Sequence, residues 1–337
     1  MAWRSEEQQM LAESASEVLA AASGPSRLRD LLAAGERVDT ALWEQLVELG
    51  WPAIPVDERD GGLGWGLAEQ AVVFEALGRH LAPTPMLSTV LLPGTALDGR
   101  VTAVAWQERA GDGGLEPDDC ASAYGDGRLT GQKVEVLDGG AAHRFLVTAL
   151  DRGEVRLFHV DAGDATVARV PRMDGRDVAT VRFDGAPATP AEPSLDDLRV
   201  ALDHAAIALA AEALGGAQAV FDLTLAYLKE RVQFDQPIGS FQALQHRAVD
   251  CFVAIELARA SVNAAAARPT PQLASLAKAR AGEAYRHVAK EAVQLHGGIG
   301  MTEECDVGFY LKRAMALSHT LGTARYHRDR WARLRGY

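Results

Sequence analysis

Long alanine-rich stretches dominate the segment from residue 194 to residue 337, and they restrict what this chain can fold into. Proline interrupts them only near Pro237 and at Pro269 and Pro271. Alanine has the most favourable intrinsic helix propensity, so such stretches predict long helices. Ser194 and the two aspartates that closely follow it form a helix N-terminus with carboxylates in its first turn. We expect four to five helices of about 20–30 residues, packed as a four-helix bundle.

A segment of different periodicity precedes these helices. Between about residues 98 and 192 the chain has short β-branched runs, such as 133–136 and 178–183. Glycine and aspartate turns, such as Gly125-Asp-Gly127, separate several of them, which is typical of strands. We therefore expect a small antiparallel β domain. A proline-rich linker with prolines at 187, 190 and 193 follows it.

The first 97 residues are typical of helices. Leu42, Leu46 and Leu49 fall on one stripe of a helix that stops at Gly50, and residues 67–78 form another amphipathic helix closed by Gly78. The sequence predicts an α+β fold with three domains. They are an N-terminal α-helical domain (1–97), a middle antiparallel β domain (98–193) and a C-terminal four-helix-bundle domain (194–337).

Composition excludes several functional classes. The chain has 34 Lys+Arg against 46 Asp+Glu, a formal net charge of −12, which argues against nucleic-acid binding because phosphate contacts need clustered positive charge. Its three cysteines are far apart, so no disulfide framework and no metal site is expected. The start of the chain is acidic and amphipathic and predicts no secretory signal. The most apolar stretch, 205–221, contains Glu212 and Gln218. We expect a soluble, cytoplasmic protein that does not bind membranes.

Two segments carry the strongest functional signal. The first reads YLKERVQFDQPIGSFQALQH over residues 227–246, and the second reads QLHGGIGMT over 294–302. Together with LWEQLVELGW (42–51) and GGLG (61–64), they resemble the acyl-CoA dehydrogenase family along the whole chain. The resemblance implies an α-helical domain, a β-barrel-like domain and a four-helix bundle. It also implies α,β-desaturation of an acyl-CoA thioester, in which a carboxylate removes the α-proton and FAD accepts the β-hydride.

The resemblance also implies how FAD is bound. In this family each FAD lies at a subunit interface, and the neighbouring subunit contacts its pyrophosphate and adenine. Arg231 matches the pyrophosphate-binding arginine, and a guanidinium suits a diphosphate. Asp235 stands where the family has glycine. The full set of matching FAD-binding positions is Arg231, Gln233, Phe234, Gln294, Gly297 and Gly298.

The positions that serve a subunit's own active site depart from the family pattern. On the strip that backs the flavin ring, Glu135 replaces an aromatic residue and Leu137 replaces a hydroxyl. The upstream loop over residues 107–113 keeps Glu108 but loses hydroxyl donors, and Arg325 replaces an adenine-side glutamine. The two family positions for the catalytic base are Ala205 and Leu321, so neither can take a proton.

This combination resembles the non-catalytic subunit of actinobacterial heterotetrameric (α2β2) acyl-CoA dehydrogenases, many of which act on CoA esters of sterol side chains. The resemblance implies a homologous partner subunit that carries the base and the flavin-ring pocket. It further implies an acyl-CoA substrate in the complex, an electron-transfer acceptor, and a role in lipid metabolism and steroid degradation.

Other interpretations stay open. Arg231 has a second one as a surface ion-pair partner of Glu230 or Asp235, and the glycines after His296 have one as a helix C-cap and turn. A self-sufficient homotetrameric flavoenzyme needs a displaced base, for which Asp203, Glu212 and Glu135 are the candidates. A purely structural subunit touches no flavin. We expect Glu108 to be a turn or interface carboxylate. His246 and His296 are expected to be structural hydrogen-bonding residues, and the Arg-rich tail (325–335) either touches a nucleotide or partner or forms a solvated helix end.

Overall fold

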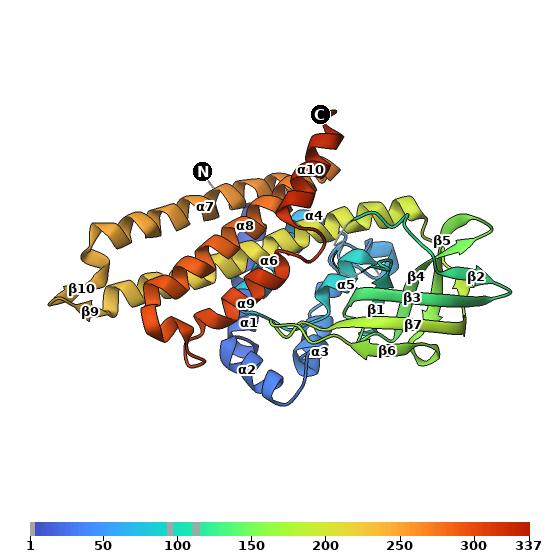
Figure 1. Ribbon diagram of the computed structural model, residues 1–337, viewed down its shortest axis with the longest axis horizontal. Coiled ribbons are helices and arrows are strands. Elements are labelled where there is room, and N and C mark those ends of the chain that lie inside the picture. The colour runs from blue at the N-terminus through green and yellow to red at the C-terminus, as the bar shows by residue number, and fades with distance from the viewer. Residues whose placement is uncertain (1–3, 93–96, 110, 112–114) are drawn as a thin grey trace. The chain divides into compact units, whose positions relative to one another are not determined.

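The computed structural model describes residues 4–92, 97–109, 111 and 115–337 (Figure 1). By their contacts the residues divide into two compact units. The first comprises the chain up to residue 30, residues 67–82 and residues 206–337, and the second comprises 31–66 and 83–205.

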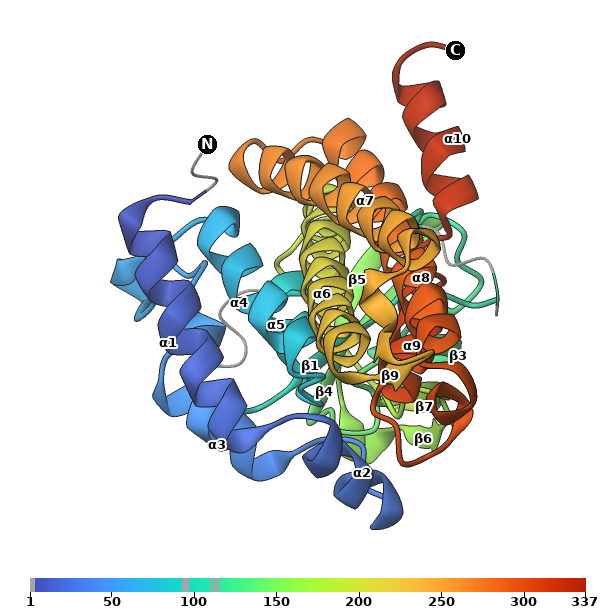
Figure 2. The same ribbon diagram turned by 90° about the vertical axis from the view of Figure 1, so that its left-hand side faces the viewer.

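The first unit is helical. Figure 2 views its long helices nearly end-on, and α8 packs against α7, α9 and α10, while α1 packs against α4. α6 contributes its residues from 206 onward to this unit, and α2 runs across the unit boundary at residue 30. The helices are α1 (Glu6–Ala22), α2 (Pro25–Ala33), α4 (Leu67–Arg79), α6 (Leu195–Glu230), α7 (Gln242–Ala267), α8 (Pro271–His296), α9 (Val307–Leu317) and α10 (Ala324–Leu334).

The lengths of the C-terminal helices differ from the expected 20–30 residues. α7 and α8 have 26 residues each, but α6 has 36, and α9 and α10 have only 11 each. Besides the breaks at the prolines, the chain leaves the α-helical conformation at residues 297–306 and 318–323. Gly297 accounts for the first break, because it directly follows α8 and adopts positive φ, which a right-handed helix does not contain. α9 ends at Leu317, ahead of the left-handed residues Leu321 and Gly322.

Glycines also set how α4 meets α6. A Cβ atom on Gly78 would lie 1.9 Å from the carbonyl oxygen of Glu212, and one on Gly215 would lie 1.8 Å from that of Glu75. The two helices therefore touch backbone to backbone. Gly78 lies inside α4, which continues to Arg79, so the expectation that it closes the helix is wrong.

α6 is the core helix of the structure. Of the helices in the described part of the chain, it alone is long and apolar enough to cross a membrane, with a mean hydropathy of 1.3 over its most apolar window. However, 83% of that window is buried inside the protein. Burial of this kind is that of a helix packed within a protein core.

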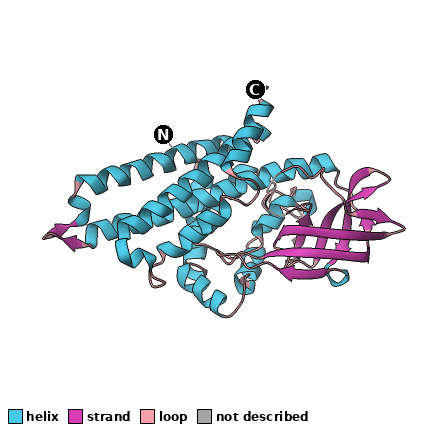
Figure 3. Cartoon of the chain, viewed as in Figure 1, coloured by secondary structure: helices cyan, strands magenta, loops and turns pink. Residues whose placement is uncertain are grey.

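The second unit is built on an eight-stranded sheet (green in Figure 1; magenta in Figure 3), with strand order β6-β7-β3-β2-β4-β5-β8 and β1 paired to β4. Its core includes an edge-to-face pair, Phe145 and Phe183, with centroids 6.0 Å apart. The helices of this unit are α3 (Thr40–Glu48), α5 (Met86–Leu91) and the short η1 (Trp51–Ala53), η2 (Glu58–Asp60) and η3 (Ala162–Asp164). The strands are β1 (Thr102–Ala105), β2 (Ala123–Gly125), β3 (Arg128–Leu137), β4 (Arg144–Asp151), β5 (Glu154–Asp161), β6 (Thr166–Arg169), β7 (Val178–Pro187) and β8 (Thr189–Pro190).

The sheet is mostly but not wholly antiparallel. β4 pairs in parallel with β1, with Thr102 opposite Arg144, and also with β2. Parallel strands need a long connection, and the β2–β3 hairpin between β1 and β4 provides it. All four residues of β1 are buried, so its sequence shows no alternation that could reveal its neighbour or direction. The prolines of the expected linker partly belong to the sheet, because β7 ends at Pro187 and β8 contains Pro190.

Candidate functional site

The two segments with the strongest sequence signal meet at one end of the first unit, where α6 and α8 finish. Tyr227, in the last turn of α6, stacks on His296, the last residue of α8, with ring centroids 4.3 Å apart and 20° between the ring planes. The Tyr227 hydroxyl donates to the His296 carbonyl oxygen at 3.4 Å. An aromatic contact thus holds the two distant segments side by side.

After α6 the chain forms a β-hairpin with a two-residue turn, and this hairpin carries Gln233 and Phe234. Its strands are β9 (Val232–Gln233) and β10 (Gln236–Pro237), which pair antiparallel. The tip residues Phe234 and Asp235 have φ of 54° and 61°, as a type I′ turn requires. Aspartate tolerates this conformation better than most residues, which explains how Asp235 replaces a glycine. Gln233, Phe234 and Asp235 are all exposed.

Arg231 lies at the base of this hairpin. Its backbone is fixed, because its N–H donates to the Tyr227 carbonyl (2.9 Å) and its carbonyl accepts from the Ile238 N–H (2.8 Å). Its side chain is exposed and forms no ion pair or hydrogen bond with any residue that the structure describes. The alternative pairing with Glu230 or Asp235 is therefore not found among these residues. The guanidinium is free to bind an external anion.

The second recognised segment, residues 294–302, begins in the last turn of α8 and continues as a short 3₁₀ turn, η5 (Gly297–Met301). Gly297 caps α8 in a conformation (φ 65°, ψ −140°) that side-chain-bearing residues rarely adopt, and its N–H donates to the Gln294 carbonyl. The helix-cap interpretation is thus correct for Gly297. It does not exclude a second role, because Gln294, Gly297 and Gly298 are all exposed.

The histidines of the two recognised segments differ in burial and in hydrogen bonding. His296 is buried, and its Nδ1 lies 2.8 Å from the Ala292 carbonyl oxygen, so it is the expected structural hydrogen-bonding residue. Burial lowers the pKa of His296, and the hydrogen bond to Ala292 only partly opposes this. His246 is exposed on α7, and its ring forms no hydrogen bond within the described ranges, so the same expectation for His246 is wrong.

The strip aligned with the flavin ring lies on β3 in the second unit. Glu135 occupies a β-bulge, where the register shifts between Lys133 and Val136, and has a left-handed φ of 54°. Its carboxylate forms an ion pair with Arg172. Leu137 is buried. At these positions the chain offers an isoalloxazine ring neither an aromatic backing nor a hydroxyl donor.

Glu108 closes the loop before this strip. Its carboxylate accepts hydrogen bonds from the Lys133 Nζ (2.6 Å), from the Ser122 N–H (2.9 Å) and Oγ (2.7 Å), and from the Ala121 N–H (2.7 Å). Burial alone would raise the pKa of Glu108, but the hydrogen bonds from Lys133 and Ser122 lower it to about 2. Glu108 is thus a turn carboxylate. Within the loop over 107–113, residues 110 and 112–113 lie outside the described residues.

Neither family base position carries an ionisable group. Ala205 is fully buried in α6, and Leu321 is buried with a left-handed φ of 53°. The Leu321 carbonyl accepts a hydrogen bond from His327 Nε2 at 2.8 Å. These positions serve packing, and proton abstraction from them is chemically impossible.

Two of the three candidate displaced bases are held in ion pairs. Glu212 is buried in α6 and accepts from Arg313 Nη1 at 2.9 Å, and Glu135 pairs with Arg172. Asp203 is buried on α6. An arginine paired with a carboxylate occupies oxygens that would otherwise be open to a substrate proton. No cluster of three or more metal-ligating side chains occurs within the described ranges.

A basic pocket of about 350 Å³ lies at the N-terminus of α10. Arg286, Arg325 and Arg328 line it, and Arg328 forms an ion pair with Glu283. Behind them, burial lowers the pKa of Lys278 to about 7. The Lys278 Nζ donates to the carbonyls at residues 317 and 322, at 2.9 and 3.1 Å. The first part of the Arg-rich tail therefore borders a cavity and is more than a solvated helix end.

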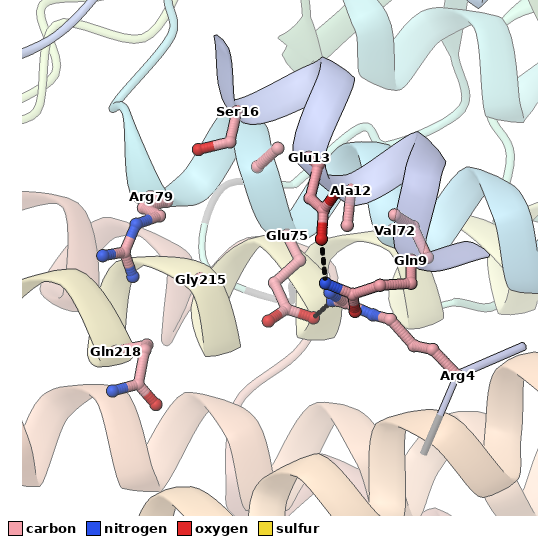
Figure 4. A pocket seen from close by; sticks show the side chains of 11 residues that line it. Arg4, Gln9, Ala12, Glu13, Ser16, Val72, Glu75, Arg79, Gly215 and Gln218 are labelled. Carbon is pink, nitrogen blue, oxygen red and sulfur yellow. Dashed lines mark hydrogen bonds and ion pairs between the residues drawn. The ribbon is translucent and has the colours of Figure 1, made fainter. Parts of the chain in front are cut away.

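A second polar cavity, of about 230 Å³, lies between α1, α4 and α6 (Figure 4). Its charged side chains pair with one another or with neighbours. Arg4 bonds Glu75 at 2.6 Å, Gln9 bonds Glu13 at 2.8 Å, and Arg79 pairs with Asp222 outside the cavity at 2.8 Å. These charges are satisfied within the protein and mark a structural network.

The contact between Tyr227 and His296 and the buried Lys133 were not identified from the sequence as functional positions. Both residues of the first pair lie within the recognised segments, but nothing in the chain order shows that their rings meet. For Lys133, the only signal in the sequence is its match to the lysine of the family segment that backs the flavin ring.

Comparison with known proteins identifies the family. Residues 5–97 match the model of the acyl-CoA dehydrogenase N-terminal domain, and residues 196–334 match that of the acyl-CoA dehydrogenase C-terminal domain. The chain belongs to the acyl-CoA dehydrogenase family, whose members are oxidoreductases.

Several individual relatives cover nearly the whole chain. It is 37% identical to the acyl-CoA dehydrogenase IpdE2 of Mycobacterium tuberculosis, over 95% of this chain and 94% of that protein. Among solved structures, it is 31% identical to the Tcur3481-Tcur3483 steroid ACAD (TM-score 0.87, 98% of each chain). It is 28% identical to a chain of the ChsE4-ChsE5 complex from Mycobacterium tuberculosis (TM-score 0.89, 100% and 99% covered). These matches confirm the predicted helical, β and helical organisation.

Proposed function

We propose that this chain is the non-catalytic subunit of a heterotetrameric (α2β2), FAD-dependent acyl-CoA dehydrogenase. In this proposal it contacts the pyrophosphate and adenine of an FAD, and a homologous partner subunit supplies the catalytic base and the pocket for the flavin ring. The observation that carries the proposal is a contrast between two regions. The end of the bundle presents an unpaired Arg231 beside exposed glycines, whereas the base positions are the buried Ala205 and Leu321.

The residues at the end of the bundle fit the phosphate and nucleotide part of FAD. A guanidinium can donate two parallel hydrogen bonds to a diphosphate, and glycines let backbone N–H groups approach a ligand. Gln233 and Gln294 add amide donors and acceptors, and Phe234 adds an apolar surface. FAD, when bound, supplies hydride acceptance. The proposed contributors are Arg231, Gln233, Phe234, Gln294, Gly297 and Gly298.

The finer assignments rest on similarity to individual solved structures. A steroid side-chain CoA ester as substrate is supported by similarity to the Tcur3481-Tcur3483 steroid ACAD. A partner of the same family is supported by similarity to a chain of the ChsE4-ChsE5 complex. A cytoplasmic location, an electron-transfer acceptor and the domain division at residues 97/98 and 193/194 complete the proposal.

Flavin stoichiometry tests the proposal directly. Visible absorbance and native mass are measured for this chain alone and after co-expression with a homologous chain encoded beside it. We expect a colourless or unstable chain alone, and one FAD per heterodimer in the complex. A stable yellow homotetramer with one FAD per chain would contradict the proposal and favour a self-sufficient enzyme with a displaced base.

Substitution of Arg231 tests its contact with FAD. Because a hydrogen bond to a charged group contributes about 1.5–3 kcal/mol, Arg231→Ala should weaken FAD binding to the complex by that amount. Arg268→Ala is the matched control, since Arg268 is also exposed and its side chain has no partner in the described part of the chain. Equal flavin affinity in both variants would instead support a structural subunit that touches no flavin.

A further inference from the structure

Each of the two strips proposed to contact FAD is joined to one member of an aromatic pair. Tyr227 precedes Arg231 by one helical turn, and the Arg231 N–H donates to its carbonyl at 2.9 Å. His296 directly precedes Gly297, and its carbonyl, which belongs to the peptide bond with Gly297, accepts from the Tyr227 hydroxyl at 3.4 Å. The stack between the two rings therefore connects the base of the hairpin with the first residue of the glycine turn.

The backbone on both sides of the stack is well defined. The hairpin is closed by the bond from the Ile238 N–H to the Arg231 carbonyl, and its tip is anchored by an edge-to-face contact between Phe234 and Phe241. His296 is only 8% exposed, and its Nδ1 is bonded to the Ala292 carbonyl. These contacts fix the local backbone of each segment, and their relative position depends on what holds α6 to α8 at this end.

From this geometry we propose that Tyr227 and His296 are positioning residues, which set the spacing between Arg231 and the Gly297–Gly298 turn. The inference rests on the proposed function, since it gives the pair a role in holding the two strips for one FAD. The diphosphate and the adenosine of FAD are covalently linked, so one molecule spans only a limited distance between the two segments. A change in strip spacing would therefore cost one of the two sets of contacts.

The test compares variants of the assembled complex of this chain with its homologous partner. Tyr227→Leu removes the ring, and His296→Leu removes the stack from the other side. Tyr227→Phe keeps the ring and removes only the hydroxyl. FAD dissociation constants are measured by flavin fluorescence, and native mass verifies assembly. Since a stacked aromatic pair is worth about 0.5–1.5 kcal/mol, we expect both leucine variants to bind FAD about 2- to 13-fold more weakly.

Tyr227→Phe should restore affinity to within about twofold of the unmodified complex, because the long hydroxyl bond contributes little. Tyr310→Leu is the matched control. Tyr310 is a buried tyrosine of the first unit, whose hydroxyl donates to the Arg79 carbonyl at 2.9 Å. Its loss should lower stability and leave the FAD dissociation constant unchanged. Rescue by phenylalanine together with an unaffected control distinguishes positioning from general destabilisation.

The outcomes separate this inference from the function on which it rests. If either assembled leucine variant binds FAD as tightly as the unmodified complex while Arg231→Ala binds it weakly, the positioning role is wrong and the proposed function stands. If Tyr310→Leu weakens FAD binding as much as Tyr227→Leu, the positioning role is also wrong. If neither Arg231→Ala nor the leucine variants change FAD binding, the proposed function itself fails.

Discussion

At the scale of single residues, carboxylates on or near the strand aligned with the flavin ring are held by basic side chains. Glu108 accepts from the Lys133 Nζ at 2.6 Å, and Lys133 is fully buried. Glu135, two residues further along β3, pairs with Arg172. Both carboxylates are tied to the protein's own cations, which stabilises the fold. The pKa of Glu108 is lowered to about 2, so this carboxylate is poorly suited to accept a substrate proton.

Glu108→Gln should make the free energy of unfolding less dependent on pH in the acidic range. The pKa of Glu108 is lowered to about 2 in the folded protein, against an ordinary value of 4.5, so its contribution is complete above about pH 5 and is lost as pH falls toward 2. At pH 7 the variant should lose about 2–3 kcal/mol of unfolding free energy, because Lys133 loses a charged partner. Urea unfolding of both proteins between pH 7 and pH 3 measures this.

The difference in unfolding free energy between the two proteins should stay constant down to about pH 5 and shrink between pH 5 and pH 3. A constant difference across that range would show that Glu108 does not titrate with folding. Glu154→Gln is a control for loss of a single negative charge, because Glu154 is exposed and its carboxylate has no hydrogen bond or ion pair with the residues that the structure describes.

At the scale of elements, close backbone contact fixes how α4 packs on α6. Gly78 and Gly215 face each other's helices, and a Cβ atom on either would lie under 2 Å from a carbonyl oxygen. The buried pair of Glu212 and Arg313 joins α6 to α9. α6 is thus held by a steric fit on one side and by an ion pair on another, and the pairing with Arg313 accounts for the burial of Glu212.

Gly215→Ala should destabilise the protein strongly. Its methyl group would meet the Glu75 carbonyl at 1.8 Å, so the helices must separate, at a cost of about 3 kcal/mol or more. Gly282→Ala is a matched control, because Gly282 is also inside a long helix but has no heavy atom within 4 Å of the added carbon. It should stabilise α8 by about 0.5–1 kcal/mol. Equal effects of the two changes on the urea midpoint would contradict the close contact.

At the scale of the whole molecule, the chain exposes the residues proposed to contact the FAD pyrophosphate and adenine. It has no base at either family position and no aromatic backing for the flavin ring. Phe234 and Met301, which lie in the hairpin and in η5, are 85% and 79% exposed. Large apolar side chains that stand this far from the core are suited to cover by another chain or a ligand. Assembly, and not a change within this chain, is therefore the step expected to complete the site.

Added FAD should stabilise the complex and not the isolated chain. A ligand that binds only the folded assembly adds RT ln(1 + [L]/Kd), about 2.7 kcal/mol when free FAD is 100 times its dissociation constant. Differential scanning calorimetry with and without excess FAD measures the shift in Tm for each sample. An equal rise for the isolated chain would show that it holds FAD alone, as a self-sufficient enzyme does.

The sequence by itself determined the features that depend on residue identity and local conformation. Alanine-rich stretches predicted the C-terminal helices, and the two recognised segments identified the family. The absence of a base at Ala205 and Leu321 needs no coordinates, because these side chains cannot bind a proton. The sequence left open whether α8 ends at Gly297. A glycine ends a helix where its backbone adopts positive φ, as at Gly297, whereas Gly78 keeps the helical conformation inside α4.

Tertiary structure alone decided which distant residues meet. The parallel pairing of β1 with β4, the contact of Tyr227 with His296 and the backbone contact at Gly78 and Gly215 all join segments far apart in the chain. Their positions depend on packing summed over many residues, which local propensity does not encode. For the same reason the pairing of Glu108 with Lys133 could not be read from either residue's neighbours. The end of the bundle became a candidate site only when folding placed both strips on one exposed surface.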